Sequence, residues 1–481
     1  MPLCSGKIRQ NVRKDNMEVF KPKNDDEGAL QRLIEHSFIK KMSFTQFLMF
    51  GYSLVILVGA VILCLPISCS ERHYTPLHHC VFTTTSALSG TGLTLYDTYS
   101  YWSLFGQIVI LIIIQVGGIG FMSIGLFALS FMGKKIGLKQ RATMRESIGS
   151  VSSGGVVKMT RFILKGTALF ESIGTVLLCF WFVPRLGWAM GIYFALFHSI
   201  SAFCTAGMDL MGYFEPGSSL ITANDSVLLN LPIIALLIIG GIGFFTWSDI
   251  VTHKQHVKKY SAQTKIILVV TVLFYLLGML DMGLLEWRNP ETMKDMGVGG
   301  KIVASSMLVT SGRDAGFASV NVAGLRQTSI MLLICFMFIG GSPGSTACGI
   351  KVTTFAVMMM TISTVFRKKK SVEFFGRRVD DTTVRNACCI TTLYLTLVIV
   401  SAMIITGVDG LELTPVIFEL VSAISSTGLS MGITTSLSDL SIFIVIVIMF
   451  FGRIGGISFI VSLHNNYASN KSQLPEEKIM L

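Results

Sequence analysis

Charged residues are scarce in this chain. Only 14% of its 481 residues are Asp, Glu, Lys or Arg, whereas 51% are hydrophobic and the mean hydropathy is +0.65. Soluble domains typically carry about 25% charged residues. This deficit, together with many long apolar runs, excludes an ordinary soluble protein and indicates a membrane protein with several spans.

The chain also lacks the signatures of enzymes and metal sites. Its ten cysteines include no CxxC pair, and its eight histidines form no zinc motif, so we predict no enzyme and no bound cofactor. The net charge of +11 would suggest nucleic acid in a soluble chain, but here the basic residues cluster between apolar spans, and no nucleic-acid partner is expected. Cys69 and Cys80 fall in the first predicted outer loop, where a disulfide is an open alternative.

One short segment occurs four times along the chain. Each copy is rich in small and hydroxyl residues and includes a glycine followed by an apolar residue. The copies are 84–94 (TTSALSGTGLT), 199–209 (SISAFCTAGMD), 308–318 (LVTSGRDAGFA) and 420–430 (LVSAISSTGLS). The glycines are Gly92, Gly207, Gly316 and Gly428, separated by 115, 109 and 112 residues. A regular period of this kind predicts a repeat architecture.

Apolar spans surround each copy and divide the chain into four units. The expected spans are about 44–66, 104–132, 161–183, 226–250, 265–288, 329–361, 388–408 and 438–463. The divisions are a tail 1–43, units 44–145, 146–259, 260–378 and 379–463, and a tail 464–481. Basic residues concentrate in the first tail and in the loops between units, so the positive-inside rule predicts that both tails are cytoplasmic.

The repeated segments are too short and too polar to cross a membrane. Each has about 15 residues, whereas a spanning helix needs about 20 apolar ones. Irregular backbone at membrane depth must be buried in protein or line a wet cavity. We therefore predict an all-α integral membrane fold of four membrane–pore-loop–membrane units, with pseudo-four-fold symmetry around one pore.

Four such loops would bring backbone carbonyls together around a monovalent cation, and glycine allows the chains to approach closely. The residues predicted to form this selectivity filter, with the cation at the glycines, are Thr91, Gly92, Ala206, Gly207, Ala315, Gly316, Thr427 and Gly428. Asp97 and Asp209 would either concentrate cations at the mouth or be ordinary loop carboxylates. Asp314 follows Arg313, so an ion pair or a helix cap is expected for it.

The sixth span contains several helix-breaking residues. A proline inside a helix costs about 3 kcal/mol, so we predict a broken helix with a loop at 340–349. The loop is either a gate under the filter or a static kink. The predicted gate residues are Gly340, Gly341, Ser342, Pro343, Gly344 and Ser345, with Arg453 of the last span either holding the loop or repelling a cation. Glu171, Glu286 and Glu419 are interpreted as structural, and His198 as packed.

This arrangement resembles the Trk/Ktr/HKT superfamily of potassium transporters over residues 44–463. The matching motifs are 115–120 (QVGGIG), 197–204 (FHSISAFC), 340–347 (GGSPGSTA), 418–419 (FE) and 452–455 (GRIG). The resemblance implies one permeation path and potassium as the transported ion. It also implies a homodimer and a separate cytoplasmic nucleotide-binding ring subunit, for which the basic loops 134–145, 254–259 and 367–378 are candidate docking surfaces. Only a polar tail precedes the first span, which favours the shorter Ktr-type branch of the family. The resemblance also implies a location in the plasma membrane of a bacterium.

The chain departs from the family pattern at a few positions. The third loop usually carries a threonine where this chain has Asp314, a branched residue is common at Gly90, and proline is frequent at Phe245 and Gly456. All four glycines are present, which in this family accompanies potassium permeation rather than sodium permeation alone. A poorly selective potassium/sodium permease stays open as an alternative, as does sodium dependence. An ion-coupled transporter of another solute fits less well, since such folds typically have two inverted repeats.

Overall fold

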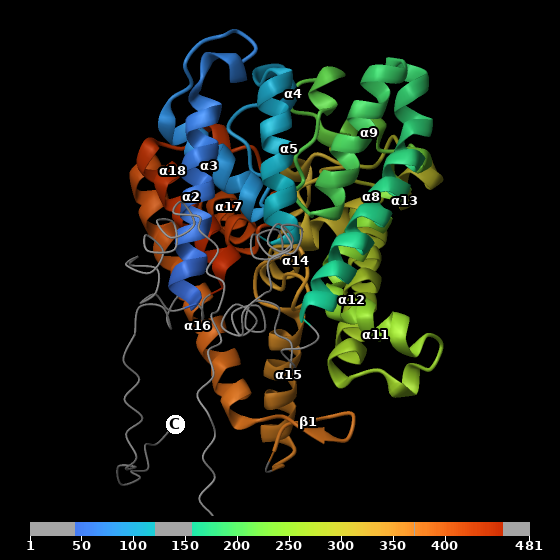
Figure 1. Cartoon of the computed structure of the whole chain (residues 1–481). Coiled ribbons are helices and arrows are strands. Elements are labelled where there is room, and N and C mark those ends of the chain that lie inside the picture. Colours follow the sequence, from blue (N-terminus) through green and yellow to red (C-terminus); the bar gives the residue numbers. More distant parts are fainter. Residues whose placement is uncertain (1–43, 121–155, 370, 456–481) are drawn as a thin grey trace, which may run out of the picture. The chain divides into compact units, whose positions relative to one another are not determined.

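The computed structural model describes residues 44–120, 156–369 and 371–455, and helices dominate it (Figure 1). The first half contains α2 (Phe44–Cys64), α3 (Leu77–Ser89), α4 (Thr98–Tyr101), α5 (Leu104–Ile119), α8 (Val156–Leu186), α9 (Trp188–Phe203), α10 (Val227–Ile242) and α11 (Phe244–His253). The second half contains α12 (Ala262–Asp281), α13 (Val298–Asp314), α14 (Gln327–Phe338), α15 (Val352–Phe366), α16 (Asp381–Asp409), α17 (Leu413–Ser425) and α18 (Asp439–Ile454).

Short elements connect these helices. A π-helical turn, η6 (Met282–Glu286), extends α12. The 3-10 turns are η2 (Pro66–Ser68), η3 (Met211–Tyr213), η4 (Ser219–Ala223), η5 (Val257–Lys259), η7 (Val322–Gly324) and η8 (Thr434–Ser436). In the third basic loop, β1 (Glu373–Phe374) pairs antiparallel with β2 (Arg377–Arg378), a small exception to the all-helical expectation. The two predicted tails and the loop 134–145 lie outside the described residues.

Within the part of the chain that the structure describes, fewer helices than the eight predicted spans are both long and apolar enough to cross a bilayer. Among the described residues, three qualify by length and hydropathy: Met159–Leu186, Ala262–Glu286 and Asp381–Asp409. A fourth span results if α10 and α11 count together, although the chain bends by 92° between them. The expected span 226–250 therefore corresponds to α10 and α11 together, with a bend at Gly243 that the sequence did not predict.

The second helix of three units stops at a glycine with positive φ. The caps are Gly120 after α5 (φ 87°), Gly243 after α10 (φ 94°) and Gly455 after α18 (φ 86°). Residues with a Cβ rarely adopt this conformation, so glycine allows the chain to leave the helix there. The expected spans 104–132 and 438–463 continue past Gly120 and Gly455 into residues that lie outside the described part of the chain.

Apolar side chains face outward along the long helices. Phe180 of α8, Leu280 of α12 and Met403 of α16 are 62%, 58% and 70% exposed. Inside, one buried cluster is built mostly from residues of the first two units and a second mostly from the last two. Lipid chains replace water around such outward-facing residues, so the pattern fits a membrane protein.

The three glutamates singled out in the sequence and His198 are buried and have hydrogen-bond partners. Gln115 Nε2 donates to both carboxylate oxygens of Glu171 at 3.0 and 3.1 Å, and Glu286 accepts from Asn289 Nδ2 at 2.6 Å. Thr434 donates to Glu419, and His198 Nδ1 lies 2.8 Å from the carbonyl of Phe194. These contacts confirm the structural interpretation of the three glutamates and the packing of His198. Cys69 and Cys80 are both free, so the disulfide is not formed.

Candidate permeation site

Four short helices, α3, α9, α13 and α17, end close to one of the repeated glycines. Each glycine packs against the next segment so closely that a Cβ would collide with backbone there. The contacts run from Gly92 to Ala206, from Gly207 to Gly316, from Gly316 to Gly428, and from Gly428 to Thr91. The four segments therefore form a closed ring in chain order, and this close approach requires glycine at each position.

Three of the four segments leave their helix in the same way. The residue after the helix, or one further on, is left-handed: Gly90 (φ 72°), Thr205 (φ 53°) and Ser426 (φ 55°). The next amide donates back to a serine carbonyl: Thr91 to Ser86 at 2.9 Å, Ala206 to Ser201 at 2.8 Å and Thr427 to Ser422 at 2.9 Å. This is the Schellman arrangement, which satisfies the last carbonyls and turns the chain sharply.

The serine of each cap also binds the segment that follows it. Ser86 Oγ donates to the carbonyl of Leu93 and Ser201 Oγ to that of Met208, both at 2.6 Å. Ser422 Oγ instead accepts from the amide of Gly428 at 2.9 Å. Sequence reasoning missed these serines, although each stands six residues before its glycine and the spacing was visible.

The third segment is different. Ser311 stands only five residues before Gly316, Asp314 remains helical, and Ala315 is extended with φ −152° and ψ 150°. Gly316 has no positive φ, so close packing alone requires a glycine there. The third segment therefore reaches the ring without a left-handed cap.

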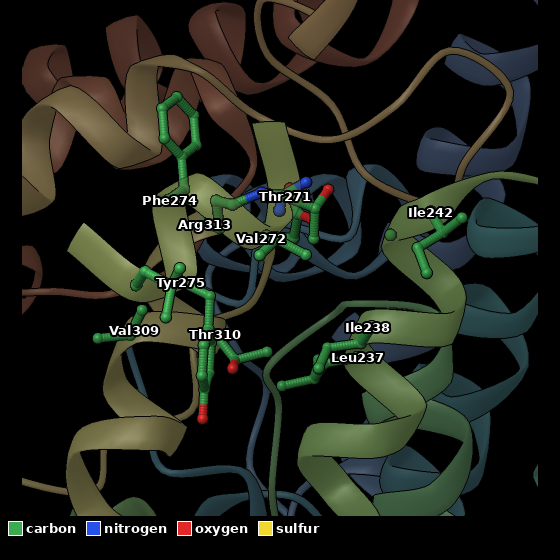
Figure 2. A pocket seen from close by; sticks show the side chains of 13 residues that line it. Leu237, Ile238, Ile242, Thr271, Val272, Phe274, Tyr275, Val309, Thr310 and Arg313 are labelled. Atoms are coloured by element: carbon green, nitrogen blue, oxygen red, sulfur yellow. Dashed lines mark ion pairs between the residues drawn. The ribbon is translucent and has the colours of Figure 1, made fainter. Parts of the chain in front are cut away.

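The carboxylate of Asp314 points toward the loop that follows α14, and not into the ring. Its oxygens lie near Gly241 and Gly341, and Arg313 Nη2 is 3.9 Å from Oδ2. Both residues border a cavity of about 260 Å³ lined by α10, α12 and α13 (Figure 2). This geometry favours the ion-pair interpretation of Asp314.

All four ring glycines line a single cavity of about 290 Å³, here called the vestibule. Residues that follow each glycine form its wall, including Asp97 and Asp209. Asp97 caps α4 through the amide of Ser100 at 2.8 Å, and Asp209 accepts from Met211 N and Ser219 Oγ at 2.9 Å each. Neither is a freely solvated carboxylate. Asp209 lies in a loop outside the spanning helices, and burial raises its pKa to about 6.

The chain between α14 and α15, residues 339–351, packs against the ends of all four short helices. Cys348 Sγ donates to the carbonyl of Ser89 at 3.6 Å, and Thr346 Oγ1 donates to that of Phe203 at 3.3 Å. A Cβ on Gly341 would lie 3.1 Å from Asp314 Oδ1, and one on Gly349 would lie 3.1 Å from Ser425 Cβ. Residues before each glycine thus contact this loop, whereas residues after each glycine line the vestibule.

Backbone hydrogen bonds anchor the loop to α10 and α11. Ser342 N donates to the carbonyl of Gly241 at 3.2 Å, and Phe244 N donates to that of Gly344 at 2.8 Å. The second bond satisfies the first amide of α11 where the chain bends at Gly243. Among the remaining predicted gate residues, Gly340 packs against Cys348, the carbonyl of Pro343 lies near Gly243, and Ser345 Oγ donates to the carbonyl of Ser342.

Arg453 joins the loop to the first unit. Its Nη1 donates to the carbonyl of Thr346 at 2.5 Å and to that of Ser89 at 3.4 Å, and its Nη2 donates to the carbonyl of Gly117. Within the loop, Lys351 Nζ donates to the carbonyl of Ala347 at 2.8 Å. A guanidinium with several fixed donors suits the joining of separate backbone carbonyls.

The family model described as "Cation transport protein" (TrkH) matches residues 34–473. The chain belongs to this family. The match confirms the resemblance inferred from the motifs, and it places the chain in a family of cation transport proteins.

Several named relatives cover nearly the whole chain. The Ktr system potassium uptake protein B of Bacillus subtilis is 35% identical, over 90% of this chain and 96% of its own length. The potassium/sodium uptake protein NtpJ of Enterococcus hirae is 33% identical, over 92% and 98%. The crystal structure of the potassium transporter TrkH from Vibrio parahaemolyticus aligns with a TM-score of 0.65 at 17% identity, over 89% of this chain and 86% of that one, and so shares the fold.

Proposed function

We propose that this chain is the ion-conducting subunit of a Ktr- or Trk-type potassium uptake system. The observation that carries the proposal is the closed ring of four glycine segments facing one vestibule. Relatives that match over most of the chain are named as potassium uptake proteins, which supports potassium as the ion. We propose no bound cofactor for this function.

Potassium would exchange its water shell for backbone carbonyls at the ring. The proposed filter residues are Thr91, Gly92, Ala206, Gly207, Ala315, Gly316, Thr427 and Gly428. The carboxyl ends of four helices carry partial negative charge close to the ring, which favours a cation there. Asp97 and Asp209 add negative charge to the vestibule wall.

The loop at 340–349 would act as a gate on the side of the ring opposite the vestibule. Its contacts with the ends of all four short helices support this position, and its irregular backbone is enclosed by protein as membrane depth requires. Arg453 would hold the loop through carbonyls of the loop and of the first unit. A static kink is the alternative outcome.

The wider assembly follows from the same proposal. The four units would surround the pore with pseudo-four-fold symmetry in the plasma membrane of a bacterium, with both termini and the basic loops cytoplasmic. The Ktr relatives are named as parts of a system, which supports partner subunits. We propose a homodimer that docks on a separate nucleotide-binding ring through the basic loops.

A second candidate is a permease that admits both potassium and sodium. One relative is named as a potassium/sodium uptake protein, and the third ring segment departs from the other three. The two candidates differ in the ratio of potassium flux to sodium flux.

Flux into proteoliposomes containing the purified chain tests both candidates. Potassium and rubidium should enter at least about tenfold faster than sodium if carbonyls select by coordination. Gly316→Asp should abolish that flux, whereas Gly407→Ala, at a helical position with no neighbour within 4 Å, is the matched control. Equal sodium flux would support the permease, and full flux in Gly316→Asp would overturn the ring as the ion path.

A further inference from the structure

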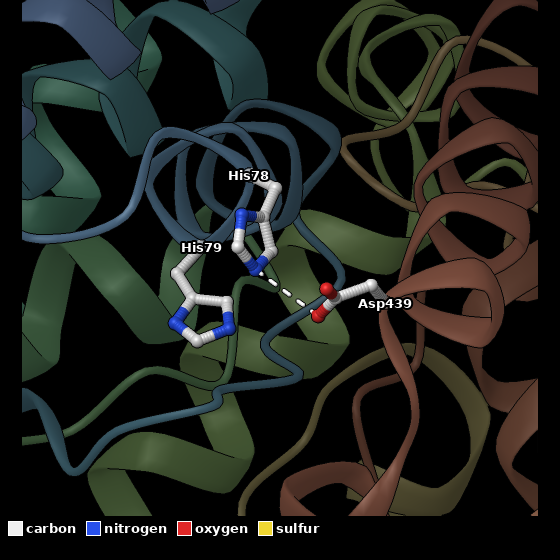
Figure 3. A group of neighbouring side chains, drawn as sticks. All are labelled: His78, His79 and Asp439. Carbon is white, nitrogen blue, oxygen red and sulfur yellow. Dashed lines mark ion pairs between the residues drawn. The ribbon is translucent and has the colours of Figure 1, made fainter.

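Two histidines at the start of α3 meet a carboxylate at the start of α18. His78 Nε2 lies 3.2 Å from Asp439 Oδ1, and the ligand atoms of His78, His79 and Asp439 all lie within 4.8 Å of one another (Figure 3). We propose that these three side chains bind one divalent transition-metal ion of the zinc class. None of the three residues belongs to the ring or lines the vestibule, although Tyr96, which contacts His79, is part of the vestibule wall.

The ligand set suits such an ion. Two imidazole nitrogens and one carboxylate oxygen are common zinc ligands, and they bind at about 2.0–2.2 Å from the metal. Ligand atoms around a tetrahedral ion then lie about 3.3 Å from one another. The three ligand atoms here lie within 4.8 Å of one another, so small side-chain rotations would bring them to that spacing. Harder ions such as magnesium prefer oxygen-only sets, which this group does not supply.

A second layer of contacts already orients one of the histidines. His79 Nδ1 lies 2.7 Å from the hydroxyl of Tyr96, which leaves Nε2 for the metal. Tyr96 stacks on Tyr101 with centroids 3.8 Å apart, and the Tyr101 hydroxyl lies 3.0 Å from Thr75 Oγ1. Metal-binding histidines usually have such a partner on the other nitrogen, which fixes the ring.

The site is accessible from solvent. The side chains of His78 and Asp439 are 45% and 85% exposed, so water can complete the coordination. The alternative to a metal site is a simple ion pair between His78 and Asp439 at the surface. An isolated surface ion pair contributes little stability, whereas a bound metal would tie α3 of the first unit to α18 of the fourth.

Zinc titration of the tag-free full chain in detergent tests the proposal by calorimetry. This readout does not depend on whether the chain conducts potassium. The wild type should show one saturable site, and zinc should raise its melting temperature because it binds the folded state. His79→Gln and Asp439→Asn should each weaken binding at least about tenfold, and Tyr96→Phe should weaken it about tenfold by freeing the His79 ring.

His256→Gln is the matched control, since His256 is exposed in the loop after α11 and should leave the affinity unchanged. Each variant is first compared with the wild type for its melting temperature without metal, so that misfolded protein is not scored. A His78→Gln/His79→Gln double variant that binds zinc as the wild type does would overturn the site. So would a wild type with no saturable binding below about 1 mM.

Discussion

The third ring segment and the other three reach the same ring by different routes. The first, second and fourth segments use a left-handed residue and a serine cap, whereas the third keeps Asp314 helical and continues extended. The ring is therefore defined by the close approach of glycines rather than by one repeated backbone conformation. Four similar sequence segments therefore do not all have the same helix-cap geometry.

The first and third ring segments also differ in the residues that connect them to the loop at 339–351. The carbonyl of Ser89, at the end of α3, accepts from Arg453 and Cys348, whereas α13 contributes the Arg313–Asp314 pair beside Gly341. The charged residues at the third segment, Arg313 and Asp314, therefore belong to its own helix. The charged residue at the first segment, Arg453, belongs to α18. The predictions below test whether this difference matters for stability, for conduction or for both.

Asp314→Asn should strongly lower stability without changing selectivity. It leaves the buried guanidinium of Arg313 without its carboxylate, which costs about 3 kcal/mol. We expect a lower melting temperature but an unchanged potassium-to-sodium flux ratio, because the carboxylate faces the loop. A double variant with Arg313→Gln should recover part of the loss. A changed flux ratio in stable protein would place Asp314 in selectivity.

Gly92→Ala and Gly316→Ala compare the two routes at the ring itself. Either methyl group meets backbone of the next segment, and overpacking of about 1–3 kcal/mol corresponds to a roughly tenfold to hundredfold lower flux. Gly92 also has φ 85°, so Gly92→Ala should destabilise the protein by about 1–2 kcal/mol more than Gly316→Ala. Flux assays measure the loss of conduction and thermal unfolding measures the loss of stability, with Gly407→Ala as the control. Equal destabilisation would mean that the left-handed geometry is not needed.

Arg453→Ala should release the loop from the first unit while its contact with Asp314 remains. If the loop obstructs the path, potassium flux should rise at least about twofold to tenfold, the effect of losing even one hydrogen bond of roughly 0.5–1.5 kcal/mol that holds the closed state. Lys351→Ala, which removes one contact within the loop region, should raise flux less. Reduced or equal flux in folded protein would favour a static kink.

The vestibule should respond to pH through Asp209. Its pKa is raised to about 6 by burial, so it is charged at pH 7.5 and becomes neutral as the pH falls through 6. Losing one negative charge at the mouth should lower potassium flux about twofold when the vestibule side is acidified. Asp209→Asn should have low flux that no longer changes between pH 5 and 7.5, and the exposed Glu215→Gln should keep the response. A pH response that persists in Asp209→Asn would assign it to another group.

The sequence predicted more of the ring than of its surroundings. Glycine spacing, hydropathy and basic loops were enough to predict a helical membrane protein of this family, because each is a local pattern that repeats. The bend at Gly243 could not be predicted, since it depends on the distant carbonyl of Gly344 accepting from Phe244. The partners of Arg453 likewise come from α3, α5 and the loop, which are brought together only by the fold.

The smallest expected effect concerns the caps of the three similar segments. Ser426 adopts φ 55° with a side chain, whereas Gly90 occupies the matching place without one. Ser426→Gly should relieve about 1–2 kcal/mol of left-handed strain, partly offset by about 0.5–1 kcal/mol of added chain entropy, and so raise stability by about 0.5 kcal/mol. Gly90→Ser should lower it by a similar amount. Thr205→Gly should show no gain, because Thr205 Oγ1 donates to the carbonyl of Cys204 at 2.8 Å and contacts Thr346 Oγ1 at 3.2 Å. Thermal unfolding of the three variants compares the caps directly, and a stabilised Thr205→Gly would show that backbone strain outweighs the link between the second segment and the loop.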